Sequence, residues 1–284
     1  MEEKISLRMR FLSGLADTLI AFILHYVVRY RLHVISDNLK GAFQYATDKA
    51  LKHDVHANYL YLAKMLRQIV VKPTRRLLSK RMRMAPFPLF DQWLAEGKSV
   101  IVTFGHTGNW EWTGSYLGML YPDQVCALYK KIKTPWINKL MQKRRNSHVN
   151  YLIETKQMGD LLRLMKKKPV LILMIADQNP GSAQGIIWAP FLGRNTAFVN
   201  GPETLAIKYS LPVVYVSSLP GHGSTYDLAC EHIYDGREPV ASGIIMQRFA
   251  RALENNIQAN RSHWLWSHKR WKRSKEADGA IPKR

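Results

Sequence analysis

Short apolar runs alternate with helix-like segments over the central part of the chain. The runs are too short for typical helices, and several are rich in β-branched residues, so we interpret them as strands. They occupy residues 98–104, 124–130, 150–154, 169–177 and 211–219. Helical patterns fill most of the spaces between them. This alternation predicts an α/β layered fold with a mostly parallel central sheet flanked by helices.

The remaining segments extend this plan at both ends. Residues 11–45 and 48–70 are predicted to form N-terminal helices, with Pro73 closing the second. The segment 225–233 alternates polar and apolar residues, which favours an edge strand, and 241–260 predicts a closing helix. We therefore expect an N-terminal membrane-associating helical region over 1–80 and an α/β catalytic domain over 81–284.

The first apolar stretch, 11–28, approaches the length of a membrane span but is interrupted by Asp17 and His25. An Asp at the centre of a lipid-embedded helix costs about 2.5–3.5 kcal/mol on insertion scales. A helix lying against a membrane surface is therefore expected, with packing onto the protein body as the open alternative. The basic residues that follow suit an anionic leaflet.

The net charge is strongly positive. Lys and Arg number 42 against 21 Asp and Glu, which gives a formal charge of +21. Such a surface attracts nucleic acid, anionic lipid, phosphorylated glycolipid or an acidic carrier protein. No helix-turn-helix, RNA-binding or zinc pattern is visible, so a non-catalytic nucleic-acid or anionic-membrane binding protein is the less favoured reading. The two cysteines, Cys126 and Cys230, have no metal-ligand spacing and suggest a reducing compartment.

The segment "FGHTGNWEW", residues 104–112, is the candidate for chemistry, with an ordinary loop that holds a capped histidine as the open alternative. His106 follows a predicted strand directly, and Glu111 falls in the first turns of the next helix. A carboxylate bonded to one imidazole nitrogen makes the other nitrogen a better base, able to take a proton from a substrate hydroxyl. We therefore predict His106 as general base with Glu111 as its orienting partner. Asp177, at the end of another strand, is expected at the same edge of the sheet.

"HTGNWE" resembles the H-x4-[D/E] motif of glycerolipid acyltransferases, and its local form most resembles the lauroyl/myristoyl lipid A biosynthesis acyltransferase family. Further segments agree with that family in order: "YRLHVISDNLKGAF", "LYKKIKTPWINKLMQKRRNS", "IADQNP", "APFLGRNTAFVNGPETLA" and "WLWSHKRWK". The resemblance extends from about residue 30 to 273. It implies a glycerolipid-acyltransferase-like fold.

The resemblance also implies roles for particular residues. His106 would act on the acceptor hydroxyl and Glu111 would orient it, while Arg145 would stand near a phosphate or a developing oxyanion. Asp177 would be a second carboxylate near the site, with Gln178 beside it. The substrate-contacting segment would include three further residues: Gly193, Arg194 and Asn200.

The implied reaction moves a fatty acyl chain from an acyl carrier protein thioester, or from acyl-CoA, to a lipid hydroxyl. A lipid A precursor is the expected acceptor, and an aminolipid or a lysophospholipid stays open. No metal or organic cofactor is implied. The implied location is the cytoplasmic face of a bacterial inner membrane. The chain departs from the family in its shorter apolar N-terminus and in "NSHV" at 146–149, where the family usually has "rfG" after the aligned arginine.

Overall fold

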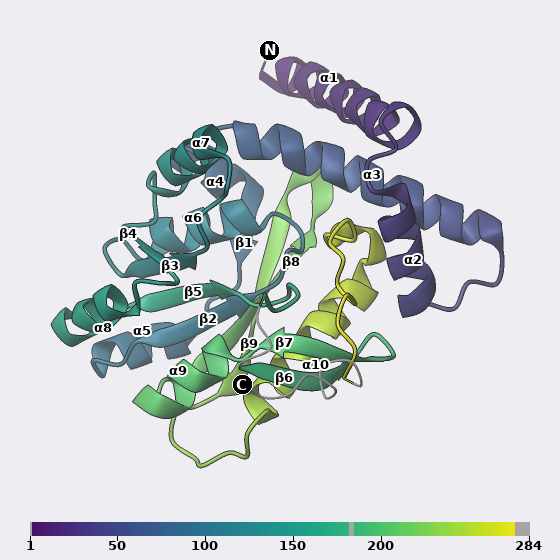
Figure 1. The fold of residues 1–284 in the computed structure, drawn as a ribbon. Helices are drawn as coiled ribbons and strands as arrows, with labels where there is room; N and C mark the ends of the chain where they lie inside the picture. Colours follow the sequence, from purple (N-terminus) through teal and green to yellow (C-terminus); the bar gives the residue numbers. More distant parts are fainter. Residues whose placement is uncertain (1, 182–184, 276–284) are drawn as a thin grey trace.

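The computed structural model describes residues 2–181 and 185–275, and its centre is a seven-stranded sheet (Figure 1). The strand order is β1-β9-β8-β2-β5-β3-β4. Within this sheet every neighbouring pair is parallel except β8 and β9. The predicted fold class, an α/β fold with a mostly parallel sheet, is confirmed. The strands are β1 (Met82–Met84), β2 (Val100–Phe104), β3 (Val125–Tyr129), β4 (Tyr151–Glu154), β5 (Leu171–Ile175), β8 (Val213–Pro220) and β9 (Tyr226–Tyr234).

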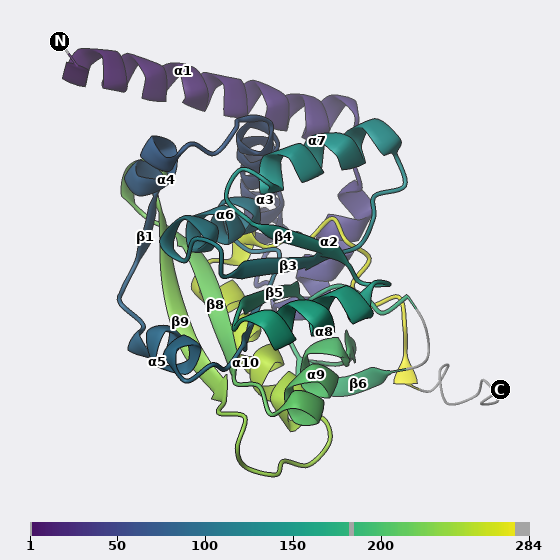
Figure 2. The same cartoon turned by 90° about the vertical axis from the view of Figure 1, so that its left-hand side faces the viewer.

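Helices cover both faces of this sheet (Figures 1 and 2). Alternate residues of β2 face opposite ways, so Val100, Val102 and Phe104 belong to one apolar core and Ile101 to the other. The first core includes side chains of α4 (Arg75–Arg81), α5 (Pro88–Ala95) and α6 (Trp110–Leu120). The second includes side chains of α8 (Met158–Lys167), α9 (Gly201–Tyr209) and α10 (Ile244–Ala259).

The prediction that residues 225–233 form an edge strand is wrong. β1 pairs with the outer side of β9, with Met82 opposite Tyr226 and Met84 opposite Leu228. The alternating pattern of β9 reflects one buried and one exposed face of the strand, with Tyr226 and Leu228 buried. A strand with one wet face can still have a neighbour on each side. The basic segment 72–84, between α3 and α5, contains α4 and β1.

A two-stranded hairpin escaped the sequence analysis. β6 (Ile186–Phe191) and β7 (Arg194–Val199) pair antiparallel beside the main sheet. Leu192 and Gly193 both have positive φ and form the turn. The sequence signal was obscured because Gly193 stands second in a tight turn that a non-glycine residue, Leu192, begins.

The N-terminal segment is broken where one helix was expected over 11–45. α1 (Glu2–Phe22) continues into the π-helical turn η1 (Ile23–Val27), and α2 (Leu32–Ala42) then leaves at an angle of 96°. Arg29 and Arg31 have positive φ at the bend. Among the described residues no single helix is long and apolar enough to cross a bilayer. The bent pair taken together has the length and the apolar composition of a span.

α3 (Asp48–Val70) matches the helix predicted for residues 48–70 and lies under α1. Thr47 caps it by accepting from the backbone N–H of Ala50. Asp17, the residue that makes a lipid-buried α1 costly, faces α3 and accepts two hydrogen bonds from Arg67, at 2.6 and 2.9 Å. α1 therefore packs onto the protein body along one face.

Candidate active site

The ends of β2 and β5 bring His106 and Asp177 together. These neighbouring strands are parallel, with Phe104 opposite Ile175. Two residues further along each strand stand His106 and Asp177, so the register alone places them side by side. His106 Nδ1 lies 2.6 Å from Asp177 Oδ1, and the His106 backbone N–H donates to Oδ2 at 2.8 Å.

A tryptophan completes the surroundings of the Asp177 carboxylate. The buried Trp264 indole N–H donates to Asp177 Oδ2 at 2.7 Å. Burial by itself would raise the pKa of Asp177. The positive charge of a protonated His106 and the hydrogen bonds from His106 and Trp264 outweigh burial and lower that pKa to about 2. Asp177 is thus an ionised acceptor that holds the imidazole with its proton on Nδ1.

The other imidazole nitrogen faces the open side of the site. Gln178 Nε2 lies 3.3 Å from His106 Nε2, and the exposed Gln178 side chain can swing away. The Trp110 ring meets the imidazole edge-on, with 4.9 Å between ring centroids. His106 Nε2 is therefore the nitrogen available to a substrate hydroxyl.

Residues 105–109, which include His106 and are called the catalytic loop here, are held in place by α3. The buried Tyr61 hydroxyl donates to the carbonyl of Gly108 at 3.0 Å. Gln68 accepts from both Asn109 Nδ2 and the Tyr226 hydroxyl, each at 2.8 Å. Asn109 in turn caps α6 by accepting from the N–H of Trp112 at 3.0 Å. Gly108 has a φ of +53°, and a Cβ there would lie 2.4 Å from the Ser218 carbonyl oxygen, so this turn requires glycine.

Glu111 is not the partner of His106, contrary to the sequence prediction. Its carboxylate accepts from Arg145 Nε at 2.9 Å and from Arg145 Nη2 at 2.5 Å. Burial would lower the pKa of Arg145, and the hydrogen bonds and charge of Glu111 outweigh burial and raise it. Arg145 is the last residue of α7 (Pro135–Arg145). Glu111 lies in the first turn of α6, and its carboxylate points toward α7. The strand register instead places Asp177 beside His106.

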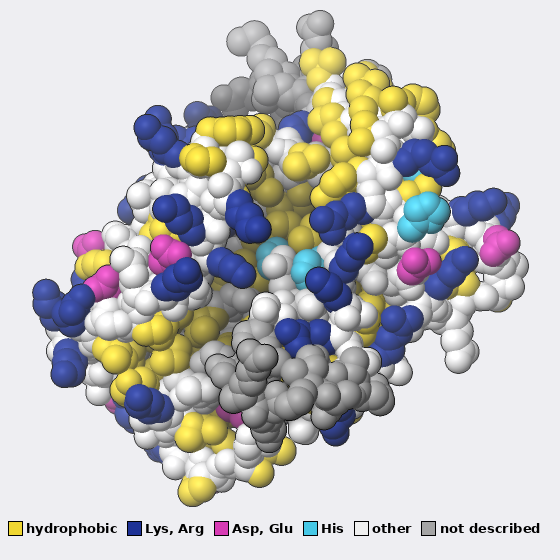
Figure 3. Space-filling view, viewed as in Figure 1, with side chains coloured by type: hydrophobic (Ala, Val, Ile, Leu, Met, Phe, Trp, Pro, Cys, Tyr) yellow, Lys and Arg dark blue, Asp and Glu magenta, His cyan; other side chains and the backbone are white. Residues whose placement is uncertain are grey.

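A cavity of about 680 Å³ opens beside His106. Its polar lining includes His106, Glu111, Arg145 and Gln178, so four of the predicted site residues meet there. Figure 3 shows a hollow on this face with histidine at its floor and lysine and arginine side chains around it. The apolar lining comes from strand ends and α6, including Phe104, Leu128, Leu173, Met174, Ile175 and Val199.

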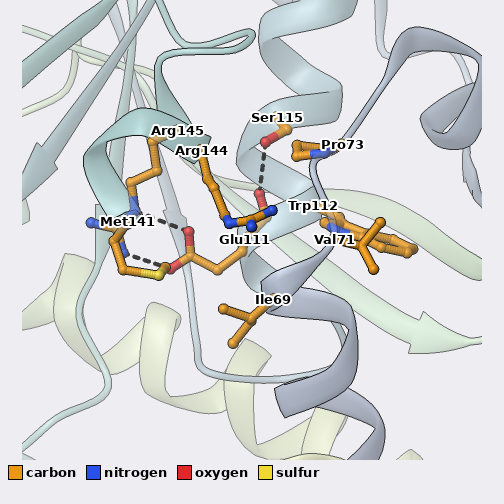
Figure 4. Close-up of a pocket in the computed structure, with 9 residues that line it drawn as sticks. All are labelled: Ile69, Val71, Pro73, Glu111, Trp112, Ser115, Met141, Arg144 and Arg145. Atoms are coloured by element: carbon orange, nitrogen blue, oxygen red, sulfur yellow. Dashed lines mark hydrogen bonds and ion pairs between the residues drawn. The ribbon is translucent and has the colours of Figure 1, made fainter. Parts of the chain in front are cut away.

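A second, much smaller hollow of about 10 Å³ lies where the end of α3, the start of α6 and α7 meet (Figure 4). Glu111, Ser115 and Arg145 line both hollows. The Glu111–Arg145 ion pair and Ser115 therefore lie between the two hollows.

The other predicted residues lie away from the His106–Asp177 pair. Arg194 donates from Nε to the carbonyl of Gly41 at 3.1 Å, and its guanidinium lies over the Trp271 ring at 4.7 Å. Gly193 forms the hairpin turn, and Asn200 precedes α9 between cavity-lining residues. The structure gives Arg194 contacts within the protein, and a contact of these three residues with substrate stays a prediction.

The family follows from a comparison with known proteins. The family model described as bacterial lipid A biosynthesis acyltransferase matches residues 12–273. The chain belongs to this family. It is thus an acyltransferase of the lipid A type, as the sequence resemblance implied. A search of curated proteins finds no match.

The C-terminal segment of this acyltransferase holds residues that the sequence analysis did not single out. Trp264 contacts Asp177 directly, and Asn58 of α3 fixes the Trp264 carbonyl with a hydrogen bond of 2.9 Å. Arg270 is buried against the Phe198 ring, 4.4 Å from its centroid, and burial lowers the pKa of Arg270 to about 10. The motif "WLWSHKRWK" signalled the importance of this segment, but no spacing within it shows which residue reaches Asp177.

Across residues 2–181 and 185–275, no group of three or more His, Cys, Asp or Glu side chains is arranged to hold a metal ion.

Proposed function

We propose that the acyltransferase moves a fatty acyl chain from a carrier thioester to a hydroxyl of a lipid A precursor, with His106 as general base and Asp177 as its orienting carboxylate. The observation that supports this most strongly is the His106–Asp177 pair at the mouth of a large, partly apolar cavity. An ionised acid on Nδ1 leaves Nε2 free to accept a proton.

The chemistry needs no nucleophile from the protein. His106 Nε2 takes the proton of the acceptor hydroxyl while its oxygen attacks the thioester carbonyl carbon. The resulting imidazolium is stabilised by Asp177. When the tetrahedral intermediate collapses, the carbon–sulfur bond breaks, and the leaving thiolate takes the proton from the imidazolium. An ester and a free carrier thiol result.

Arg145 is the candidate for stabilising the negative oxygen of the intermediate. It lines the cavity with His106, and Glu111 fixes its position by two hydrogen bonds. A fixed cation near developing charge stabilises a transition state without reorganisation of its own. Glu111 thus acts on the site through Arg145.

The cavity suits the acyl chain. About 680 Å³ falls within the range of ligand-binding cavities, and its walls at Leu128, Leu173 and Val199 are apolar. Each buried methylene contributes about 0.8 kcal/mol, so the depth of the cavity would set a preference for chain length.

An acyl carrier protein is the proposed donor because it is acidic and this chain carries +21. Acyl-CoA, whose phosphates are also anionic, is the alternative donor. The ring of basic side chains around the hollow in Figure 3 supports an anionic carrier of either kind.

The inner leaflet of a bacterial inner membrane is the proposed location. α1 and η1 leave an apolar stripe exposed on the side away from α3: Leu12, Leu15, Leu19, Phe22, Ile23, Tyr26 and Val27. It forms the hydrophobic area over α1 in Figure 3. Its spacing is that of one helix face, which suits a helix lying in the lipid headgroup layer.

The test is acyl transfer from carrier protein thioesters to lipid acceptors, followed by mass spectrometry. We expect His106→Ala to abolish transfer to a lipid A precursor. His53→Ala, at a side chain that is 79% exposed, is the control and should retain full activity. Persistent transfer by His106→Ala would refute the mechanism. Preference of the wild type for an aminolipid or a lysophospholipid would instead reassign the acceptor.

A further inference from the structure

Arg144, which precedes the predicted site residue Arg145, has two guanidinium nitrogens that lack hydrogen-bond partners among the described residues. These atoms, Nε and Nη1, are buried. Exposed charged groups find water, but a buried charge without a partner is costly. An arginine held in this way is suited to an acceptor that is not part of the protein chain.

The guanidinium points into the small hollow between α3, α6 and α7 (Figure 4). The hollow, at about 10 Å³, has room for about one water-sized oxygen atom. Val71 forms part of its wall and is 42% exposed, so the hollow lies close to the surface. One oxygen of an anionic group can therefore enter while the rest of the group stays outside.

The charges around the hollow favour an anion. Glu111 is neutralised by Arg145, which leaves Arg144 as a net positive charge in this lining. Guanidinium groups match the oxygens of phosphate with two parallel donors. A phosphate group fits this chemistry, with one oxygen accepting from Arg144.

The surroundings indicate a lipid rather than a free ion. Leu66, Val70 and Val71 expose apolar side chains at the end of α3, next to the hollow and on the helix that carries α1. Ile69 and Met141 line the hollow itself. Apolar side chains beside a cation form the pattern that a lipid headgroup and its first methylenes would contact.

We propose that Arg144 binds a phosphate of the lipid acceptor, which enters between the end of α3 and α7. Because Glu111, Ser115 and Arg145 line both hollows, a headgroup at Arg144 lies against the wall of the catalytic cavity. This assignment rests on the proposed function for the identity of the acceptor as a lipid.

A binding assay tests the proposal without requiring turnover. Dioctanoyl phosphatidic acid and dioctanoylglycerol, which differ only in the phosphate, are titrated below micelle formation into the wild type, Arg144→Gln and Lys143→Gln. Lys143 is an exposed neighbour on the same helix, so its substitution removes the same charge. We expect Arg144→Gln to weaken binding of the phosphatidic acid about tenfold and Lys143→Gln to leave it unchanged.

Equal binding of the phosphatidic acid by Arg144→Gln and wild type would overturn the proposal and leave Arg144 with bound water only. Inorganic phosphate provides the second arm. If phosphate alone binds as tightly as the phosphatidic acid, the lipid assignment is overturned.

The kinetic arm separates this proposal from the proposed function. With phosphorylated and dephosphorylated forms of the acceptor, Arg144→Gln should raise KM about tenfold for the phosphorylated form only and change kcat little. If wild type transfers to neither form, the proposed function fails, while the binding assay still decides the role of Arg144.

Discussion

At the scale of single residues, the site depends on a carboxylate that comes from a different strand than its histidine. Asp177→Asn keeps the size of the side chain but removes the charge that stabilises the imidazolium, and it offers the wrong hydrogen-bonding group to Nδ1. We expect kcat to fall on the order of 10²–10⁴-fold. Steady-state kinetics with a carrier thioester would check this. A drop confined to KM would contradict an orienting role.

Trp264 supplies the second test at this scale. Trp264→Phe keeps an aromatic ring but removes the N–H that donates to Asp177 at 2.7 Å. Loss of a donor raises the pKa of a carboxylate, so less of Asp177 is ionised at low pH. We expect kcat to fall about tenfold and the acidic limb of its pH profile to move to higher pH.

Trp266→Phe is the matched control, because the equally buried Trp266 indole donates to the Arg261 carbonyl at 2.6 Å instead. If both variants shift the pH profile alike, the effect of Trp264 is one of packing.

At the scale of helices and strands, the ends of β2 and β5 were predictable because each is a short apolar run that stops at a polar residue. The partner of His106 was not predictable from local spacing. Glu111 stands five residues from His106, whereas Asp177 is 71 residues away and reaches it through a strand register. The register is set by packing on both faces of the sheet, which no local pattern contains. The β6–β7 hairpin was missed for a different reason: its turn begins at Leu192, a residue that does not signal a tight turn.

α1 carries the prediction that belongs to this scale. Leu15 and Leu19 are 52% and 61% exposed on its outer face. Changing both to Ser removes apolar area that a bilayer would cover, at about 1.5–3 kcal/mol for each fully buried side chain. We expect binding to phosphatidylglycerol-containing vesicles to weaken at least tenfold in a co-sedimentation assay.

Ile207→Ser is the control, since Ile207 is 47% exposed and belongs to α9, which lies at the opposite end of the molecule from α1 (Figure 1). Thermal stability should stay near that of the wild type in both variants. Vesicle binding that survives the double substitution would exclude this stripe as the membrane contact.

At the scale of the whole molecule, two histidines make stability depend on pH. Burial lowers the pKa of His263, with help from Lys64, and burial lowers that of His268; both values are about 4. Both are neutral in the folded protein near pH 6, whereas the unfolded chain takes up protons below about pH 6.5. The free energy of unfolding therefore falls as pH drops from about 6.5 to 4.

Calorimetry at several pH values in that window would show a falling Tm. A His263→Gln, His268→Gln double variant should show a shallower slope over the same window. An unchanged slope in the double variant would contradict the assignment to these two groups.

The bracing of the catalytic loop by α3 limits how the enzyme can be shortened. Tyr61 and Gln68 bind the backbone and side chains around His106. Both residues belong to α3, the helix that packs against α1. A truncation at residue 81, meant to yield an easily handled fragment, would remove these supports together with the apolar stripe. Solubility is therefore better engineered by polar replacements on the outer face of α1 than by deletion. The apolar surface of α1 and the residues of α3 that support His106 belong to one packed pair of helices, so deletion removes both.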